Sequence, residues 1–135
     1  KQLQYTLKNI EVKNRVEFIA HTTNALEYIY GADMLIQPSR SEALPRTILE
    51  AMSLKTPILA SDVDGIPELV QHNKSAFLFS LSNPNQIIEG IAKIYLNKSY
   101  DKKIVDAAYK SYWEKFSRNT HINNYKKFID TVINA

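Results

Sequence analysis

A short apolar run that leads through a polar loop into an amphipathic helix constrains the fold most strongly. Met34-Leu35-Ile36 carries no charge, as a buried parallel strand would, and Gln37-Pro38-Ser39 ends the run. Pro45 suits the first position of a helix, where its missing N–H costs no hydrogen bond. A buried strand that passes into a helix is the repeating unit of α/β folds built on a parallel sheet.

The rest of the sequence continues this alternation of strands and helices. The expected architecture is therefore α/β, a Rossmann-like parallel sheet flanked by helices, with right-handed crossovers and a single domain over residues 1–135. The predicted strands cover residues 16–19, 34–37, 57–61 and 76–79. Helices are predicted near the N-terminus up to residue 7, at 24–30 with Gly31 as its stop, at 45–54, at 67–71, from Asn83-Pro84 through Ile94, at 101–116 and at 121–133.

Two glutamates flank the predicted loop-to-helix junction. Glu42 lies in the loop, and Glu50 follows eight positions later, inside the helix. Glu50 shares a face with Arg46 and Thr47, opposite the apolar face that we expect against the sheet. The apolar face consists of Ile48, Leu49 and Met52. The polar face points toward the carboxyl ends of the strands, where open α/β sheets bind ligands.

This arrangement suits a ligand that carries both hydroxyls and phosphate. Carboxylates accept hydrogen bonds from hydroxyls, and the free N–H groups at a helix N-terminus bind anions. A sugar nucleotide has that layout, with hydroxyls at both ends and a diphosphate between them. The same two glutamates also suit a solvated helix face and an ordinary acidic loop, and their spacing alone leaves both interpretations open.

Composition is that of a soluble globular domain. The chain has 135 residues, of which 44% are hydrophobic and 23% charged. No apolar run approaches the roughly 18 residues that cross a bilayer, and no signal-peptide pattern opens the sequence. The absence of cysteine excludes disulfides and thiolate chemistry and is typical of a cytoplasmic protein.

The positive charge is concentrated toward the C-terminus. From Lys98 onward, eight Lys or Arg residues face four Asp or Glu residues. Aromatic and apolar residues recur there at helical spacing, which favours a core stripe with a basic solvated face over a nucleic-acid interface. That stripe is Val105, Ala108, Tyr109, Tyr112 and Phe116. Peripheral contact with an anionic membrane surface remains open, whereas no nucleic-acid partner is expected.

Metal chemistry finds little support in the sequence. His21, His72 and His121 are far apart, and none pairs with a nearby acid at ligand spacing. Asp62 and Asp64 follow a predicted strand and could suggest Mg²⁺, but a polar turn is the simpler interpretation. We expect no metal and no cofactor.

The order of the motifs resembles a known enzyme family. The motifs are the strand with Pro38-Ser39, the pair Glu42 and Glu50 with Ala51-Met52, the segment Thr56-Pro57-Ile58-Leu59-Ala60, and Gly65-Ile66-Pro67-Glu68. Together they resemble retaining glycosyltransferases of family 4, from about Val16 to the end of the chain. That family has the GT-B fold, in which two Rossmann-like domains face each other across a cleft. The resemblance implies the C-terminal, donor-binding domain, including its C-terminal helices.

The resemblance also implies roles for individual residues. Glu50 matches the glutamate that binds the ribose hydroxyls, and Glu42 matches the catalytic glutamate beside the donor sugar. Members of the family bind the sugar hydroxyls and the phosphate through backbone groups of this loop and through the first turn of the following helix. They bind the base near the position of the strand predicted at 16–19. The positions here are Ala43, Leu44, Arg46 and Thr47 for the sugar and phosphate, and Phe18 and Ile19 for the base.

The sequence departs from the family in its glycines and its extent. Positions that are usually glycine are occupied by Ala20, Ala43, Lys55, Asp64, Asn73 and Ala76. A lysine in the left-handed conformation at position 55 would cost roughly 1 kcal/mol. The family's glycine-rich phosphate loop and its N-terminal acceptor lobe are not in this sequence, so we expect a fragment that is inactive alone.

Two functions of different classes follow. The first is the donor-binding part of a hexosyltransferase-type enzyme that transfers sugar from a nucleotide diphosphate sugar to a glycan or lipid-linked acceptor, in bacterial surface polysaccharide synthesis. The second is a non-catalytic Rossmann-like binding or interaction domain. The enzyme is expected to be cytoplasmic, with possible peripheral contact at the inner face of the membrane.

Overall fold

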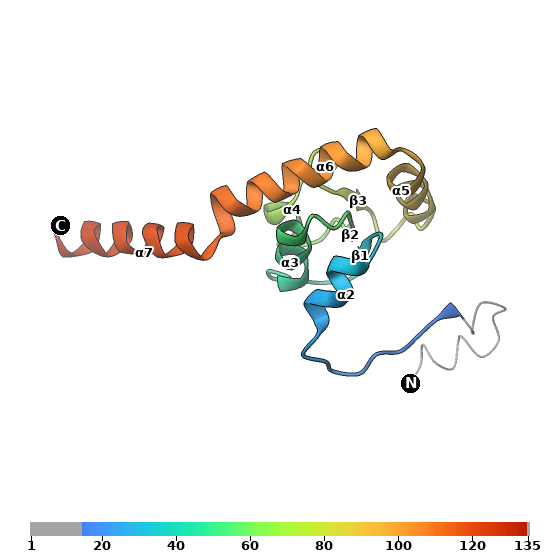
Figure 1. Cartoon of the computed structure of the whole chain (residues 1–135). Coiled ribbons are helices and arrows are strands. Elements are labelled where there is room, and N and C mark those ends of the chain that lie inside the picture. The colour runs from blue at the N-terminus through green and yellow to red at the C-terminus, as the bar shows by residue number, and fades with distance from the viewer. Residues whose placement is uncertain (1–14, 135) are drawn as a thin grey trace.

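A computed structural model describes residues 15–134 and shows a small parallel sheet enclosed by helices (Figure 1). The strands are β1 (Leu35–Gln37), β2 (Ile58–Ser61) and β3 (Phe77–Phe79). The helices are α2 (Ala25–Gly31), α3 (Arg46–Leu54), α4 (Ile66–Leu69), α5 (Asn85–Leu96), α6 (Lys98–Ser111) and α7 (Arg118–Ile133), with a π-helical turn, η2 (Tyr112–Phe116), between the last two. This order confirms the predicted α/β fold class.

The three strands pair in parallel and in chain order. In the sheet β1-β2-β3, Leu35 lies opposite Ile58, and Leu59 lies opposite Phe77. Every residue of β2 and β3 is buried, as expected for strands covered on both faces. The carboxyl ends of all three strands therefore meet at one edge of the sheet.

Side chains of alternating direction divide the core between the two faces of the sheet. One face carries Ile58, Ala60 and Leu78, which pack with residues of α2, α3 and α4. The opposite face carries Leu59, Phe77 and Phe79, which pack with Ile94 of α5 and Ile104 of α6. The predicted apolar face of α3 is confirmed in Ile48 and Met52, which are fully buried.

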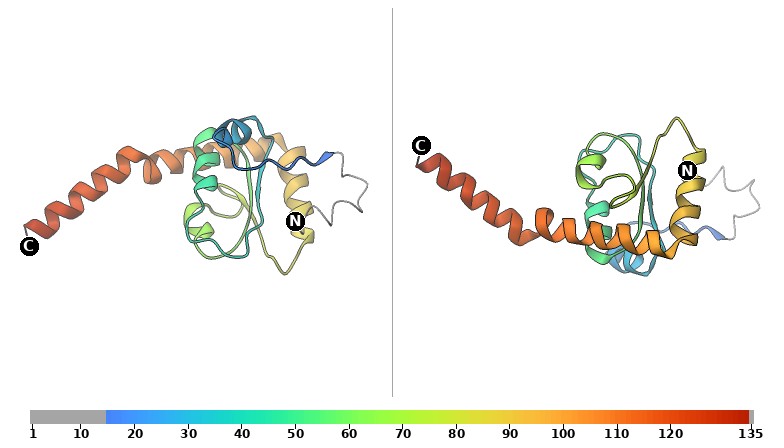
Figure 2. Two further views of the ribbon diagram at one scale, coloured as in Figure 1. Left: turned by 90° about the horizontal axis from the view of Figure 1, so that it is seen from below. Right: turned by 90° about the horizontal axis from the view of Figure 1, so that it is seen from above.

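The C-terminal helices form two different environments. Ala108 of α6 is buried and belongs to the core. Tyr112 and Phe116, the ends of η2, are partly buried and pack against the same core. Helix α7 extends away from the body of the domain (Figure 2) and has no buried residue. None of the helices within residues 15–134 is both long and apolar enough to cross a bilayer.

The predicted strand at 16–19 is wrong. Residues 16–20 are irregular, and Val16, Phe18 and Ile19 are each more than 40% exposed. A strand requires a neighbour that satisfies its backbone N–H and C=O groups, and the sheet of the described residues ends at β1. The predicted N-terminal helix, up to residue 7, lies outside the described residues.

The helix boundaries differ from the expected ones by up to five residues, and two of these differences have a clear local cause. Pro45 precedes α3 instead of opening it, because its backbone is extended and its carbonyl accepts the first helical hydrogen bond, from the Ile48 N–H at 3.1 Å. The helix predicted at 101–116 begins earlier, at Lys98, because the Asn97 side chain accepts a hydrogen bond from the Tyr100 N–H and caps it.

Among residues 15–134, three have left-handed backbone, and all three stand where the resembled family usually has glycine. They are Lys55 (φ 59°), Asp64 (φ 43°) and Asn73 (φ 59°). The conformation predicted for Lys55 is thus confirmed: its N–H caps α3, and its Nζ lies 3.3 Å from Asp106 Oδ1. Each such residue costs roughly 1 kcal/mol relative to glycine, which contacts of the side chain can offset.

Candidate functional site

Hydrogen bonds at the carboxyl edge of the sheet fix the chain as it leaves β1. The buried Ser61, at the end of β2, donates from Oγ to the Ser39 carbonyl at 2.6 Å and lies 3.3 Å from the Gln37 carbonyl. The loop after β1 is thereby attached to the neighbouring strand. It presents its polar side chains at the edge where parallel α/β sheets bind ligands.

The carboxylate of Glu42 is the centre of this edge. Its Oε1 accepts hydrogen bonds from Gln37 Nε2 at 2.9 Å and from Ser39 Oγ at 2.7 Å. Thr47 Oγ1, in the first turn of α3, donates to Gln37 Oε1 at 3.1 Å, which fixes the orientation of that amide. Two neutral donors therefore hold a half-buried carboxylate in one position.

A second loop, which follows β2, holds the backbone of the Glu42 loop. Asp64 Oδ2 accepts from Ser41 Oγ at 2.6 Å and from the Glu42 N–H at 3.2 Å. The Gly65 N–H donates to the Glu42 carbonyl at 3.0 Å. A Cβ at Gly65 would lie 1.7 Å from the Ala43 carbonyl oxygen, so only glycine permits this approach.

The backbone N–H groups between Glu42 and α3 make this junction a candidate anion-binding site. Among the described residues, no acceptor is found for the N–H groups of Ala43, Leu44 and Arg46. Leu44 is 52% exposed, and the Arg46 side chain is 88% exposed. Free N–H groups at the start of a nine-residue helix attract negative charge.

Glu50 faces a different part of the surface. It lies 3.9 Å from Arg46 Nη2, with 27% of its side chain exposed. It lines a pocket of about 210 Å³ between α3 and the C-terminal segment. The other lining residues are Arg46, Leu49, Ser53, Tyr112 and Phe116. No hydrogen bond among residues 15–134 joins Glu50 to the Glu42 cluster, although both flank the same junction.

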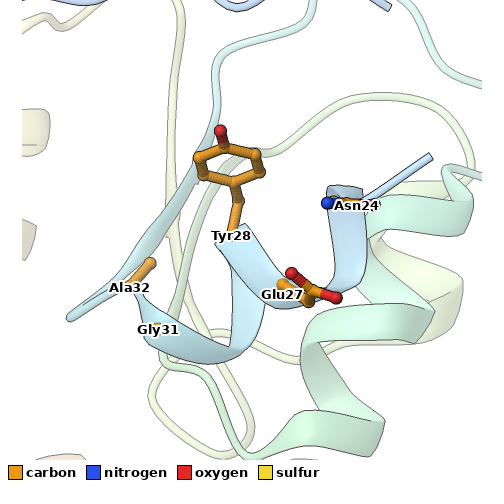
Figure 3. A pocket seen from close by; sticks show the side chains of 5 residues that line it. All are labelled: Asn24, Glu27, Tyr28, Gly31 and Ala32. Carbon is orange, nitrogen blue, oxygen red and sulfur yellow. The ribbon is translucent and has the colours of Figure 1, made fainter. Parts of the chain in front are cut away.

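Another pocket lies away from this edge. It has a volume of about 300 Å³ and is lined only by α2 and its ends, through Asn24, Glu27, Tyr28, Gly31 and Ala32 (Figure 3). The Tyr28 and Glu27 side chains leave the helix in different directions there and do not converge. The pocket therefore brings no set of polar groups to one point.

The structure brings only some of the predicted site residues together. Glu42 and Thr47 belong to one hydrogen-bonded cluster, and Glu50 lies further along α3. Phe18 and Ile19 lie in the irregular segment before α2 and are nearly half exposed. Sequence reasoning missed Gln37, Ser39 and Ser61, although polar residues directly after apolar strands were a signal that could have found them.

Comparisons with known proteins agree with this fold. The family model "Glycosyl transferases group 1" matches residues 1–111. The N-acetyl-alpha-D-glucosaminyl L-malate synthase of Bacillus anthracis is 23% identical over 127 residues, which are 94% of this chain and 33% of that protein. The chain thus spans about a third of the length of this relative.

Solved structures show the same architecture. Anabaena Alr3699/HepE, crystallised in complex with UDP-glucose, superposes with a TM-score of 0.88 at 21% identity, over 96% of this chain and 36% of that one. The C-terminal domain of the group 1 family protein LpcC from Francisella tularensis gives 0.73 at 19% identity, over 87% and 64%. The fold is that of a GT-B glycosyltransferase domain. With the family model covering most of the sequence, the chain belongs to the group 1 glycosyl transferases.

Proposed function

We propose that this chain is the donor-binding part of a retaining glycosyltransferase, which transfers a sugar from a nucleotide diphosphate sugar to a glycan or lipid-linked acceptor. The observation that carries the proposal is the Glu42 carboxylate, held by Gln37 and Ser39 beside the start of α3. The structural relative crystallised with UDP-glucose supports the choice of donor class. Bacterial surface polysaccharide synthesis is the pathway that we propose.

The site divides the donor into three parts. The sugar lies beside Glu42, whose negative charge stabilises positive charge that develops at the anomeric carbon. The diphosphate is bound by the N–H groups of Ala43, Leu44 and Arg46 and by the Thr47 hydroxyl. The ribose hydroxyls are bound by Glu50, and the base lies toward Phe18 and Ile19. We propose that transfer needs no metal, since these groups supply both the anion site and the carboxylate.

The setting of the enzyme follows from the same proposal. We propose that the acceptor is bound by a separate lobe, as the resemblance to two-domain GT-B enzymes implies; the chain covers about a third of the length of its relative from Bacillus anthracis. We propose a cytoplasmic location, with the basic segment after Lys98 in contact with the anionic inner face of the membrane. A complete protein that binds nucleotides and transfers no sugar would favour the alternative, a non-catalytic binding domain.

Glu50→Gln in the complete protein is expected to weaken nucleoside diphosphate binding about tenfold. The carboxylate accepts two hydroxyl hydrogen bonds, whereas the amide offers one acceptor and a donor, which costs about 1.4 kcal/mol. Calorimetric titration with UDP, GDP and ADP identifies the preferred nucleotide and measures the change. Glu89→Gln, on the exposed surface of α5, removes the same charge far from the site and serves as the control. If Glu50→Gln binds the nucleoside diphosphate as tightly as the unaltered protein, Glu50 does not bind the ribose, and its ion pair with Arg46 is the role that remains.

Residues 1–135 on their own are expected to transfer no sugar. Glycosyl transfer requires acceptor and donor to be held together in one geometry, and we assign the acceptor to a separate lobe. The measurement compares transfer by the purified segment with transfer by the complete protein, using UDP-, GDP- and ADP-sugars. Transfer by the segment alone would show that the acceptor site is built within these residues.

A further inference from the structure

The Glu42 loop is fixed by a carboxylate that the proposed donor site does not use. Asp64 lies in the turn after β2, and its Oδ2 accepts from both Ser41 Oγ and the Glu42 N–H, at 2.6 and 3.2 Å. The next residue, Gly65, adds the hydrogen bond from its N–H to the Glu42 carbonyl. The backbone of Glu42 is thus held on its N–H and on its carbonyl by the same turn.

The turn holds an aspartate in a strained backbone conformation, at a position that glycine would occupy without strain. Asp64 has φ 43°, in the left-handed region, whereas the neighbouring Gly65 has φ −79°, which any residue adopts. Gly65 is required because the Ala43 carbonyl approaches it, so the conformational freedom of glycine is not what that position uses. A strained residue stands at position 64, and its carboxylate makes the two contacts that reach Glu42 and its neighbour.

We propose that Asp64 is a positioning residue, whose carboxylate fixes the loop that carries Glu42 and so sets the place of the Glu42 carboxylate at the sugar. The inference rests on the proposed function, because it assigns a role that is exerted through Glu42. The Glu42 side chain is held by Gln37 and Ser39, and its backbone N–H is held by Asp64. Without the contacts to Asp64, the Glu42 side chain would still bond to Gln37 and Ser39, but the backbone of its loop would be free to shift.

A purely structural role for Asp64 makes a different prediction. If the carboxylate only stabilised the turn, Asp64→Gly would leave the turnover number unaltered, whatever its effect on thermal stability. Glycine adopts φ 43° without strain, so the lost hydrogen bonds are offset and the thermal midpoint is expected to stay the same or to rise. A positioning role instead lowers turnover at unchanged stability, since a small displacement of a reacting group has a large effect on rate.

The experiment measures kcat, KM and UDP affinity in the complete protein. Asp64→Gly is expected to lower kcat about tenfold, with KM and UDP affinity within twofold of the unaltered enzyme. Asp64→Asn is expected to retain most of kcat, because both hydrogen bonds converge on one oxygen and an amide oxygen accepts both. Lys55→Gly is the matched control: it also removes a left-handed side chain, at φ 59°, but outside the site, and kcat is expected to stay unchanged.

Glycine also loosens the backbone, and a further variant separates that effect. Asp64→Ala removes both hydrogen bonds without adding a glycine, and it is expected to lower kcat about tenfold. Full activity of Asp64→Ala beside a weakened Asp64→Gly would overturn the proposal, since the loss would then come from the backbone alone. An Asp64→Asn variant as inactive as Asp64→Gly would also overturn it, because the charge and not the contacts would matter.

Combination with Glu42→Gln distinguishes failure of this inference from failure of the proposed function. If Asp64 acts through Glu42, Asp64→Gly lowers kcat far less in the Glu42→Gln background than in the unaltered enzyme. Equal losses in both backgrounds overturn the positioning role alone. If Glu42→Gln keeps full turnover, the proposed role of Glu42 fails, and the positioning role fails with it.

Discussion

Gly65→Ala is expected to lower the free energy of unfolding of this domain by about 3 kcal/mol or more. The added Cβ would lie 1.7 Å from the Ala43 carbonyl oxygen and 3.3 Å from that of Glu42. Both neighbours are backbone atoms, so no side-chain rotation relieves the overlap. The turn after β2 and the Glu42 loop must separate, which breaks the hydrogen bond from the Gly65 N–H to the Glu42 carbonyl. Calorimetry of the complete protein is expected to show a fall in thermal midpoint of roughly 10 °C.

Gly31→Ala provides the matched control for this prediction. The same methyl group at the end of α2 meets nothing within 4 Å, and the backbone there is helical. Alanine is favoured over glycine in helices, so the midpoint is expected to stay constant or to rise slightly. Equal destabilisation by the two substitutions would mean that loss of glycine flexibility, and not the contact with Ala43, limits stability.

Local patterns were sufficient to predict most of the secondary structure. Each of β1, β2 and β3 lies within its predicted range. Burial on both faces holds for β2 and β3, as short uncharged runs indicate. The burial predicted for β1 is wrong, because β1 lies at one edge of the described sheet and its Ile36 is 43% exposed. Helix α3 begins one residue later than predicted and ends at the predicted residue, with Ile48 and Met52 buried in the core. These elements depend on residues close together in the sequence.

Features that depend on distant partners could not be predicted in this way. Residues 16–19 have the composition of a strand, but a strand forms only beside another, and β1 is the edge of the described sheet. The π-helical turn at Tyr112–Phe116 could not be predicted from the local sequence either, because the same residues continue the apolar stripe of an ordinary helix. Neither outcome is encoded in the local pattern.

The site shows the same division. The spacing of Glu42 and Glu50 placed both residues at the junction between β1 and α3, and the structure has that junction. The contact of Asp64 with Glu42 was missed, because Asp64 is 22 residues away and reaches the loop only through the packing of β2 beside β1. The sequence therefore identified the candidate carboxylates, whereas their positions are set by contacts between loops.

Glu42→Gln in the complete protein is expected to lower the turnover number at least about a hundredfold. Glutamine has the same shape, and its amide oxygen still accepts from Gln37 Nε2 and Ser39 Oγ, so the loop keeps its conformation. What disappears is the negative charge beside the anomeric carbon, which counts most when positive charge develops in the transition state. Affinity for UDP, GDP or ADP is expected to change little, because a nucleoside diphosphate lacks the sugar that Glu42 contacts.

Steady-state kinetics and titration of the two glutamine variants, with Glu89→Gln as the charge control, test this separation. Glu42→Gln should lose turnover and keep nucleotide affinity, whereas Glu50→Gln should lose affinity. A Glu42→Gln enzyme with full turnover would remove the carboxylate from the reaction. If that variant instead lost affinity as much as activity, Glu42 would be a nucleotide-binding or structural residue, and its bonds to Gln37 and Ser39 would serve the loop alone. The charge of one carboxylate, held between two neutral donors, is thus what the experiment isolates.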